Sequence, residues 1–184
     1  MLNFNLSDRS KSNSILMNFL KHFIIWSIKM AEFTLHTEQT APDAAQPLIA
    51  NSKTAFGMLP NLHAVMAEAP TLLEGYQVLH ELFQNTSFNA EELTVVWQTI
   101  NVEHNCHYCV PAHSAIAASM KVDPAIVDAL VNKTPLADKK LETLRETTLA
   151  MTQNRGVISD EQIEAFFAVG YAQQQLLEIV LGLA

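Results

Sequence analysis

The sequence predicts an all-α fold, a helical bundle that forms a single domain over residues 31–184. Apolar residues recur at spacings of three and four along almost the whole chain, which is the periodicity of a helix buried on one side. No segment shows the sustained alternation of apolar and polar residues that is typical of a half-buried strand. The predicted connections are two to six residues long, so most neighbouring helices should run antiparallel.

Nine helices are predicted, with ends uncertain by two to four residues. They cover about residues 44–58, 61–69, 71–85, 89–104, 106–120, 124–132, 138–154, 160–169 and 172–184.

Local signals support several of these helix ends. Asp123 followed by Pro124 is typical of a helix start, because the aspartate caps the first turn and proline suits its first position. Ser159 and Gln162 have the spacing of a capping box. Gly156 fits the left-handed residue that ends the preceding helix.

Residues 1–30 differ from the rest of the chain, and Met30-Ala31-Glu32 resembles a natural start. We interpret 1–30 as a disordered or spurious extension, since its longest apolar run is far shorter than the ~20 residues that span a bilayer. No stable membrane insertion is therefore expected. The apolar pattern of the last helix continues to the final residue, so we expect that helix to be truncated.

Charge argues against nucleic acid as a partner. The formal net charge is −8, and residues 1–30 carry four basic groups and one acidic group, hence +3, which leaves −11 for the remainder. A folded part that is this acidic, without basic residues interleaved among aromatic ones, lacks the electrostatic surface that nucleic acid requires.

The only two cysteines, Cys106 and Cys109, are three positions apart. A disulfide that closes so short a loop adds little stability, so this pair indicates chemistry more than architecture. Pro111 is tolerated only in the first turn of a helix, which places the helix start between Asn105 and Tyr108, with Asn105 as its N-cap. Cys106 would then lie at the positive end of the helix dipole, where a thiolate is stabilised.

Cys109 and His113 are four residues apart on this predicted helix, so they share a face. With an ordinary pKa of ~6.5, the His113 imidazole can accept the proton of the Cys109 thiol near neutral pH. If one thiol attacks a peroxide, its sulfenic acid condenses with the second thiol, and a dithiol donor then reopens the disulfide. We therefore predict a peroxide-reducing thiol enzyme that uses no cofactor and no metal.

Two other functions fit the same residues. A decarboxylase or lactone-processing enzyme would use His113 for acid and base chemistry and leave the thiols idle. A redox- or metal-sensing module would use Cys106, Cys109 and His113 with His104 or His107 as zinc ligands. His104 and His107 are expected to face solvent, whereas His63 and His80 fall on apolar helical stretches and are expected in the core or an interface.

From about Ala55 onward, and above all in Cys106-x-x-Cys109-x-x-x-His113, the chain resembles the alkylhydroperoxidase D-like branch of the carboxymuconolactone decarboxylase family. This resemblance implies an all-α bundle that assembles as trimers or hexamers. It also implies a cytoplasmic antioxidant enzyme that takes electrons from a partner disulfide reductase system. Cys106 and Cys109 would be the redox pair and His113 its proton acceptor, with either sulfur attacking first.

The chain departs from the family pattern in two places. Members often carry histidine just before the second cysteine, where this chain has Tyr108. Their relay glutamate can lie further upstream, so Glu103 is our candidate for orienting His113, with Glu81 and Glu92 as alternatives. A carboxylate bound to the imidazole would fix its orientation and raise its basicity.

Overall fold

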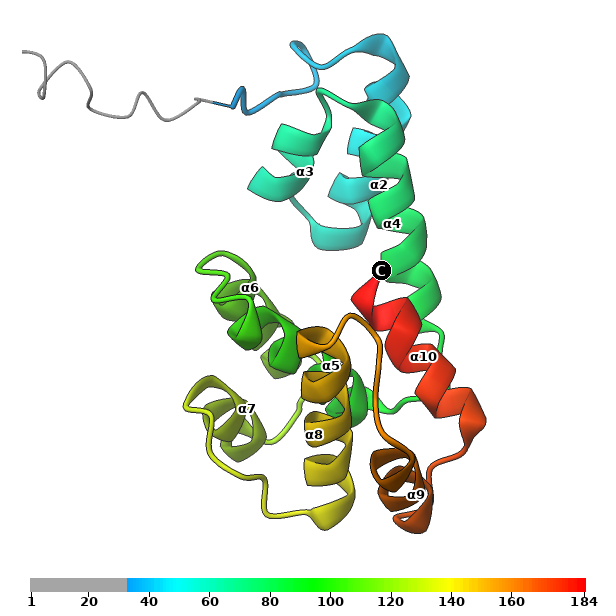
Figure 1. Ribbon diagram of the computed structural model, residues 1–184. Coiled ribbons are helices and arrows are strands. Elements are labelled where there is room, and N and C mark those ends of the chain that lie inside the picture. The colour runs from blue at the N-terminus through cyan, green and yellow to red at the C-terminus, as the bar shows by residue number, and fades with distance from the viewer. Residues whose placement is uncertain (1–32) are drawn as a thin grey trace, which may run out of the picture. The chain divides into compact units, whose positions relative to one another are not determined.

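The computed structural model describes residues 33–184, so the extension predicted over residues 1–30 lies outside the described part (Figure 1). The contacts divide the chain into two compact units, one ending at Glu68 and the other spanning Ala69–Ala184. Each unit is described by itself.

The first unit contains a short 3₁₀ helix and two α-helices: η1 (Asp43–Ala45), α2 (Gln46–Phe56) and α3 (Asn61–Met66). Gly57 ends α2 with a positive φ of 71°, and its N–H closes the last turn on the carbonyl of Lys53. Buried His63 forms a hydrogen bond between its Nδ1 and Ser52 Oγ at 2.8 Å. This histidine is therefore a satisfied core residue, as its apolar surroundings in the sequence predicted.

The second unit holds seven helices, and α5 lies in contact with four of the others: α6, α7, α8 and α10. The helix α4 packs on α10, and α9 packs on α8. Their bounds are α4 (Pro70–Gln84), α5 (Ala90–Glu103), α6 (Cys109–Ser119), α7 (Pro124–Val131), α8 (Lys139–Gln153), α9 (Asp160–Ala168) and α10 (Gln173–Leu183).

The helix α5 is the buried scaffold of this unit. Residues 92–99 are buried without interruption, because helices surround α5 on several sides. A capping box fixes its start: Asn89 Oδ1 accepts from the Glu92 N–H at 3.0 Å, and Glu92 Oε2 accepts from the Asn89 N–H at 3.0 Å. These two bonds satisfy amides that a helix start otherwise leaves open.

The close approach of α10 to α4 and α5 depends on Gly182. A Cβ atom at this position would lie 2.8 Å from Phe83 and 2.9 Å from Val96. Phe83 is almost fully buried and belongs to the main apolar cluster with Val96, Leu144, Phe166 and Ile179. The absence of a side chain at Gly182 thus lets the last helix pack tightly onto the core.

The predicted all-α class is confirmed, and residues 33–184 contain no strand. The observed helices match the nine predicted ranges with end differences of at most three residues. The predicted caps at Asp123 and Ser159 are present, as is a positive φ at Gly156. Within the described range, the helices are too short or too polar to cross a membrane.

Candidate functional site

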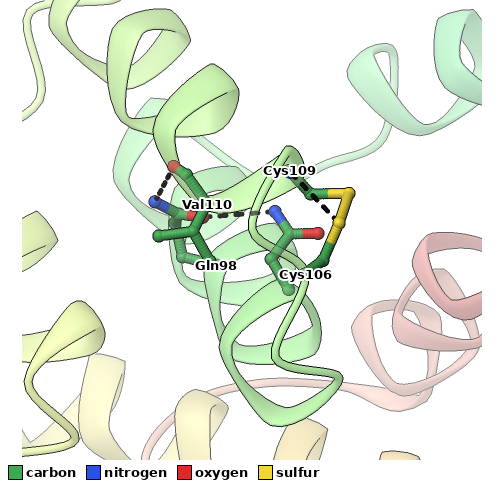
Figure 2. Close-up of a disulfide and its surroundings, with 5 residues drawn as sticks. Gln98, Cys106, Cys109 and Val110 are labelled. Carbon is green, nitrogen blue, oxygen red and sulfur yellow. Dashed lines mark hydrogen bonds between the residues drawn. A yellow bond between two sulfur atoms is a disulfide. The ribbon is translucent and has the colours of Figure 1, made fainter. Parts of the chain in front are cut away.

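Cys106 and Cys109 form a disulfide at the start of α6, with their Cα atoms 5.3 Å apart (Figure 2). Both residues are partly buried. The backbone N–H of Cys109 donates a hydrogen bond to Cys106 Sγ at 3.1 Å. The two sulfurs that the sequence singled out are therefore joined, and one of them accepts a bond from the main chain.

The predicted role of Asn105 as the N-cap of α6 is wrong. Asn105 has a left-handed φ of 51°, and it ends α5. The N–H of Cys106 donates to the carbonyl of Asn101 at 3.0 Å, which is the closure that follows a left-handed residue at a helix C-terminus. Asparagine tolerates this conformation better than most residues, so it serves the end of one helix and not the start of the next.

As a result, α6 starts at Cys109, three residues later than the predicted helix. Pro111 is its third residue, within the first turn as predicted. Cys106 lies one turn ahead of the helix and accepts two N–H groups from its first turn: that of Cys109 on its sulfur at 3.1 Å and that of Val110 on its carbonyl at 3.1 Å. The Cys109 amide stabilises negative charge on Cys106 Sγ when the disulfide opens.

His113 follows Cys109 by one turn on α6, and its ring packs on Trp97 with centroids 5.0 Å apart. Its Nδ1 is buried and has no hydrogen-bond partner among residues 33–184. Burial, with a smaller contribution from nearby His80, lowers the pKa of His113 to about 4. The sequence predicts an imidazole that titrates near neutrality, whereas burial in the structure favours its neutral form at pH 7.

His80 reaches the same aromatic group from α4. Its ring stacks on Trp97 with centroids 5.2 Å apart and an angle of 14° between the planes. Burial lowers the pKa of His80 below the ordinary value. Two imidazoles thus contact one indole, an arrangement that no local sequence signal gives, since α4 and α5 bring these residues together.

The structure does not bring Glu103 to His113. Glu103 Oε1 accepts a hydrogen bond from Gln153 Nε2 of α8 at 3.0 Å. The residue also lines a small pocket beside Thr99, Lys133 and Arg145. The Glu103 side chain therefore lies on the side of α5 that faces α8. These contacts do not support its predicted role in orienting the His113 imidazole.

The two alternative carboxylates do not bind the imidazole either. Glu92 caps α5 and forms an ion pair with Lys140, with Nζ and Oε1 3.0 Å apart. Glu81 is exposed on α4. Among the described residues, none of the three candidate carboxylates hydrogen-bonds His113.

His104 and His107 are exposed, as predicted. Within residues 33–184, no three or more histidine, cysteine, aspartate or glutamate side chains are grouped so that they could hold a metal ion. The four-ligand zinc site considered from the sequence therefore lacks a geometric basis here.

The solved structures that share the fold include the following two. One is an uncharacterized peroxidase-related protein from Silicibacter sp. TM1040, with a TM-score of 0.68, 19% identity and coverage of 85% of each chain. The other, from Ralstonia eutropha JMP134, is described as an alkylhydroperoxidase AhpD core and an uncharacterized peroxidase-related protein. It has a TM-score of 0.72 and 17% identity, and the match covers 82% of this chain and 81% of that one.

No family model and no curated protein matches the chain. At this identity the structural matches establish the fold, which is that of the alkylhydroperoxidase AhpD core. The fold implied by the sequence resemblance is thus confirmed, and the Cys-x-x-Cys spacing agrees with it.

Proposed function

We propose that this protein is a thiol-dependent peroxidase whose redox pair is Cys106 and Cys109 and whose proton acceptor is His113. The observation that carries the proposal is the Cys106–Cys109 disulfide, placed one turn before a buried neutral imidazole on the same helix. A peroxidase of this kind passes through a disulfide in each cycle. The names of the two structural matches, both peroxidase-related, favour the same reaction class.

The oxidative half-reaction starts from the dithiol. One thiolate attacks the terminal oxygen of a hydroperoxide, ROOH. The O–O bond breaks, and the sulfur keeps that oxygen as a sulfenic acid, S–OH. The leaving alkoxide takes up a proton to give ROH. The second thiol then attacks the sulfenic sulfur, releases water and forms the disulfide.

His113 acts on the proton of the attacking thiol. A neutral imidazole accepts a proton, and a thiolate formed beside it favours the resulting imidazolium by charge attraction. The proton then passes to the leaving alkoxide. The depressed pKa of His113 in the disulfide form fits this cycle, because the imidazolium has no adjacent thiolate once the sulfurs are joined.

The reductive half-reaction needs an external dithiol. Its thiolate attacks one sulfur of the disulfide, a mixed disulfide forms, and the donor's second thiol resolves it. The Cys109 N–H that points at Cys106 Sγ stabilises Cys106 as the leaving thiolate, which favours attack on Cys109. Partial exposure of both cysteines gives the donor access.

The test uses Cys106→Ser and Cys109→Ser, with Ser119→Ala on the exposed side of α6 as the matched control. Thiols are counted before and after one equivalent of cumene hydroperoxide, and turnover is followed with dithiothreitol as the donor. We expect the parent and the control to lose two thiols per hydroperoxide, and both serine variants to lose turnover. Turnover that survives in both serine variants, or after alkylation of both thiols, would refute the thiol mechanism.

A further inference from the structure

The side chain of Gln98 is completely buried in the middle of α5. An amide in this position costs free energy unless its polar atoms are hydrogen-bonded. Glutamine is mostly found on protein surfaces, so its burial here requires a specific reason.

Both hydrogen bonds that this amide donates go to α6, the helix that begins at Cys109, and Figure 2 shows the one to Val110. Gln98 Nε2 donates to the carbonyl of Val110 at 3.1 Å and to Ser114 Oγ at 2.9 Å. Gln98 Oε1 accepts from Asn101 Nδ2 at 3.2 Å, which fixes the orientation of the amide.

The same two residues of α5 hold both ends of the Cys-x-x-Cys segment. Asn101 accepts the N–H of Cys106 on its backbone carbonyl at 3.0 Å, immediately before the first sulfur. Gln98 holds the carbonyl of Val110, immediately after the second cysteine. Because Gln98 and Asn101 are one helical turn apart and bonded to each other, the two attachment points have a fixed separation.

We propose that Gln98 is a positioning residue that holds the two cysteines at disulfide spacing in both redox states and thereby sets the reduction potential of the pair. The biological meaning of this potential rests on the proposed peroxidase function. Its measurement does not, because the equilibrium involves no peroxide.

The relevant exchange is disulfide + 2 GSH ⇌ dithiol + GSSG, in which two electrons pass from glutathione to the protein. A held segment keeps the two reduced thiols close together, so their effective concentration is high and the disulfide is favoured. Removing the hydrogen bonds of Gln98 lets the segment relax after reduction, which stabilises the dithiol and shifts the equilibrium toward it.

The experiment is a glutathione titration of the pair, read by alkylation of free thiols and mass measurement. Gln98→Met keeps the length and approximate volume of the side chain but removes its donors and acceptor. We expect the equilibrium to shift about tenfold toward the dithiol, which corresponds to a potential about 30 mV less negative.

Thr94→Val is the matched control. Thr94 is also buried on α5, but its hydroxyl donates to the carbonyl of Ala90 within the same helix and does not reach the redox segment. Its equilibrium should stay within twofold of the parent protein. An equal shift in Thr94→Val, or an unchanged equilibrium in folded Gln98→Met, overturns the proposal.

Ser114→Ala keeps the inference testable if Gln98→Met does not fold. This variant removes one acceptor of Gln98 and also the bond from Ser114 Oγ to the Val110 carbonyl. We expect a shift in the same direction but smaller, and no shift in this variant contradicts the proposal. A shifted potential in a protein that does not consume peroxide would refute the peroxidase function and leave the role of Gln98 intact.

Discussion

The helices α5 and α6 are consecutive in the chain, but they are built in opposite ways. A capping box starts α5, and eight consecutive residues of it are buried. In contrast, α6 lacks a side-chain cap, carries a proline in its first turn, and has Ala117 as its buried residue. The buried and capped helix is α5, whereas α6, which has less burial and no side-chain cap, carries Cys109 of the disulfide and His113. The difference agrees with the proposal that hydrogen bonds from α5 position the Cys106–Cys109 segment.

The largest expected effect is a loss of hydroperoxide turnover when a residue of α6 is replaced. Replacing His113 with leucine keeps the bulk against Trp97 but removes the proton acceptor, and general-base groups contribute about 10²–10⁴-fold to rate. We expect hydroperoxide turnover at pH 7 to fall at least about 100-fold, measured with the same thiol assay. His107→Leu, at an exposed position nearby, serves as the control and should keep its rate. Equal losses in the two variants would remove His113 from the mechanism.

A second effect concerns stability and pH. The pKa of His113 is about 4 in the folded protein, below the value of ~6.5 expected when the chain is unfolded. The unfolded state therefore binds the proton first as pH falls, so stability is full above pH 6.5 and is lost progressively down to pH 4. Between pH 7 and pH 5 we expect a loss of about 2 kcal/mol from this group.

Urea unfolding of the oxidised protein at both pH values measures this loss. In His113→Leu the difference between pH 7 and pH 5 should be smaller by that amount, because the titrating group is gone. His80 remains in both proteins, so the part of its pKa shift that comes from burial is present on both sides of the comparison. An identical pH dependence in the two proteins would show that His113 titrates normally.

The smallest effect is expected at the start of α5. Asn89→Ala removes the side-chain half of the capping box and should lower the free energy of unfolding by about 1 kcal/mol. Because this end of α5 is remote in sequence from Gln98 and Asn101, the glutathione equilibrium should not change. Parallel chemical unfolding and redox titration would check both statements. A shifted glutathione equilibrium in this variant would mean that the stability of the start of α5 also affects the cysteine pair.

Much of the fold was readable from the sequence because its signals are local. The three- and four-residue apolar spacing locates the helices, and the side chains of Asp123 and Ser159 cap backbone N–H groups only two or three residues away. The pairing of the two cysteines was equally local, since three positions separate them. The N-cap prediction for Asn105 is wrong because asparagine favours both helix N-caps and left-handed helix ends. Its positive φ and the hydrogen bond from the Cys106 N–H to the Asn101 carbonyl place it at a helix end.

The environment of the site was not readable in the same way. Gln98 looks like any other polar helix residue, and its burial depends on where α6 and α8 pack. The contact of His80 with Trp97 joins two helices. Glu103 is close to Cys106 in sequence, but the end of α5 turns its carboxylate toward Gln153. Closeness in sequence to Cys106 therefore does not predict that Glu103 contacts His113, because the chain changes direction at Asn105.

The left-handed turn at Asn105 has one more consequence. It ends α5 before the cysteine bridge, so that Cys106 lies between the two helices while Cys109 is the first residue of α6. The bridge therefore joins the connection between the helices to the first turn of α6, where the carbonyl of Cys106 also accepts the N–H of Val110.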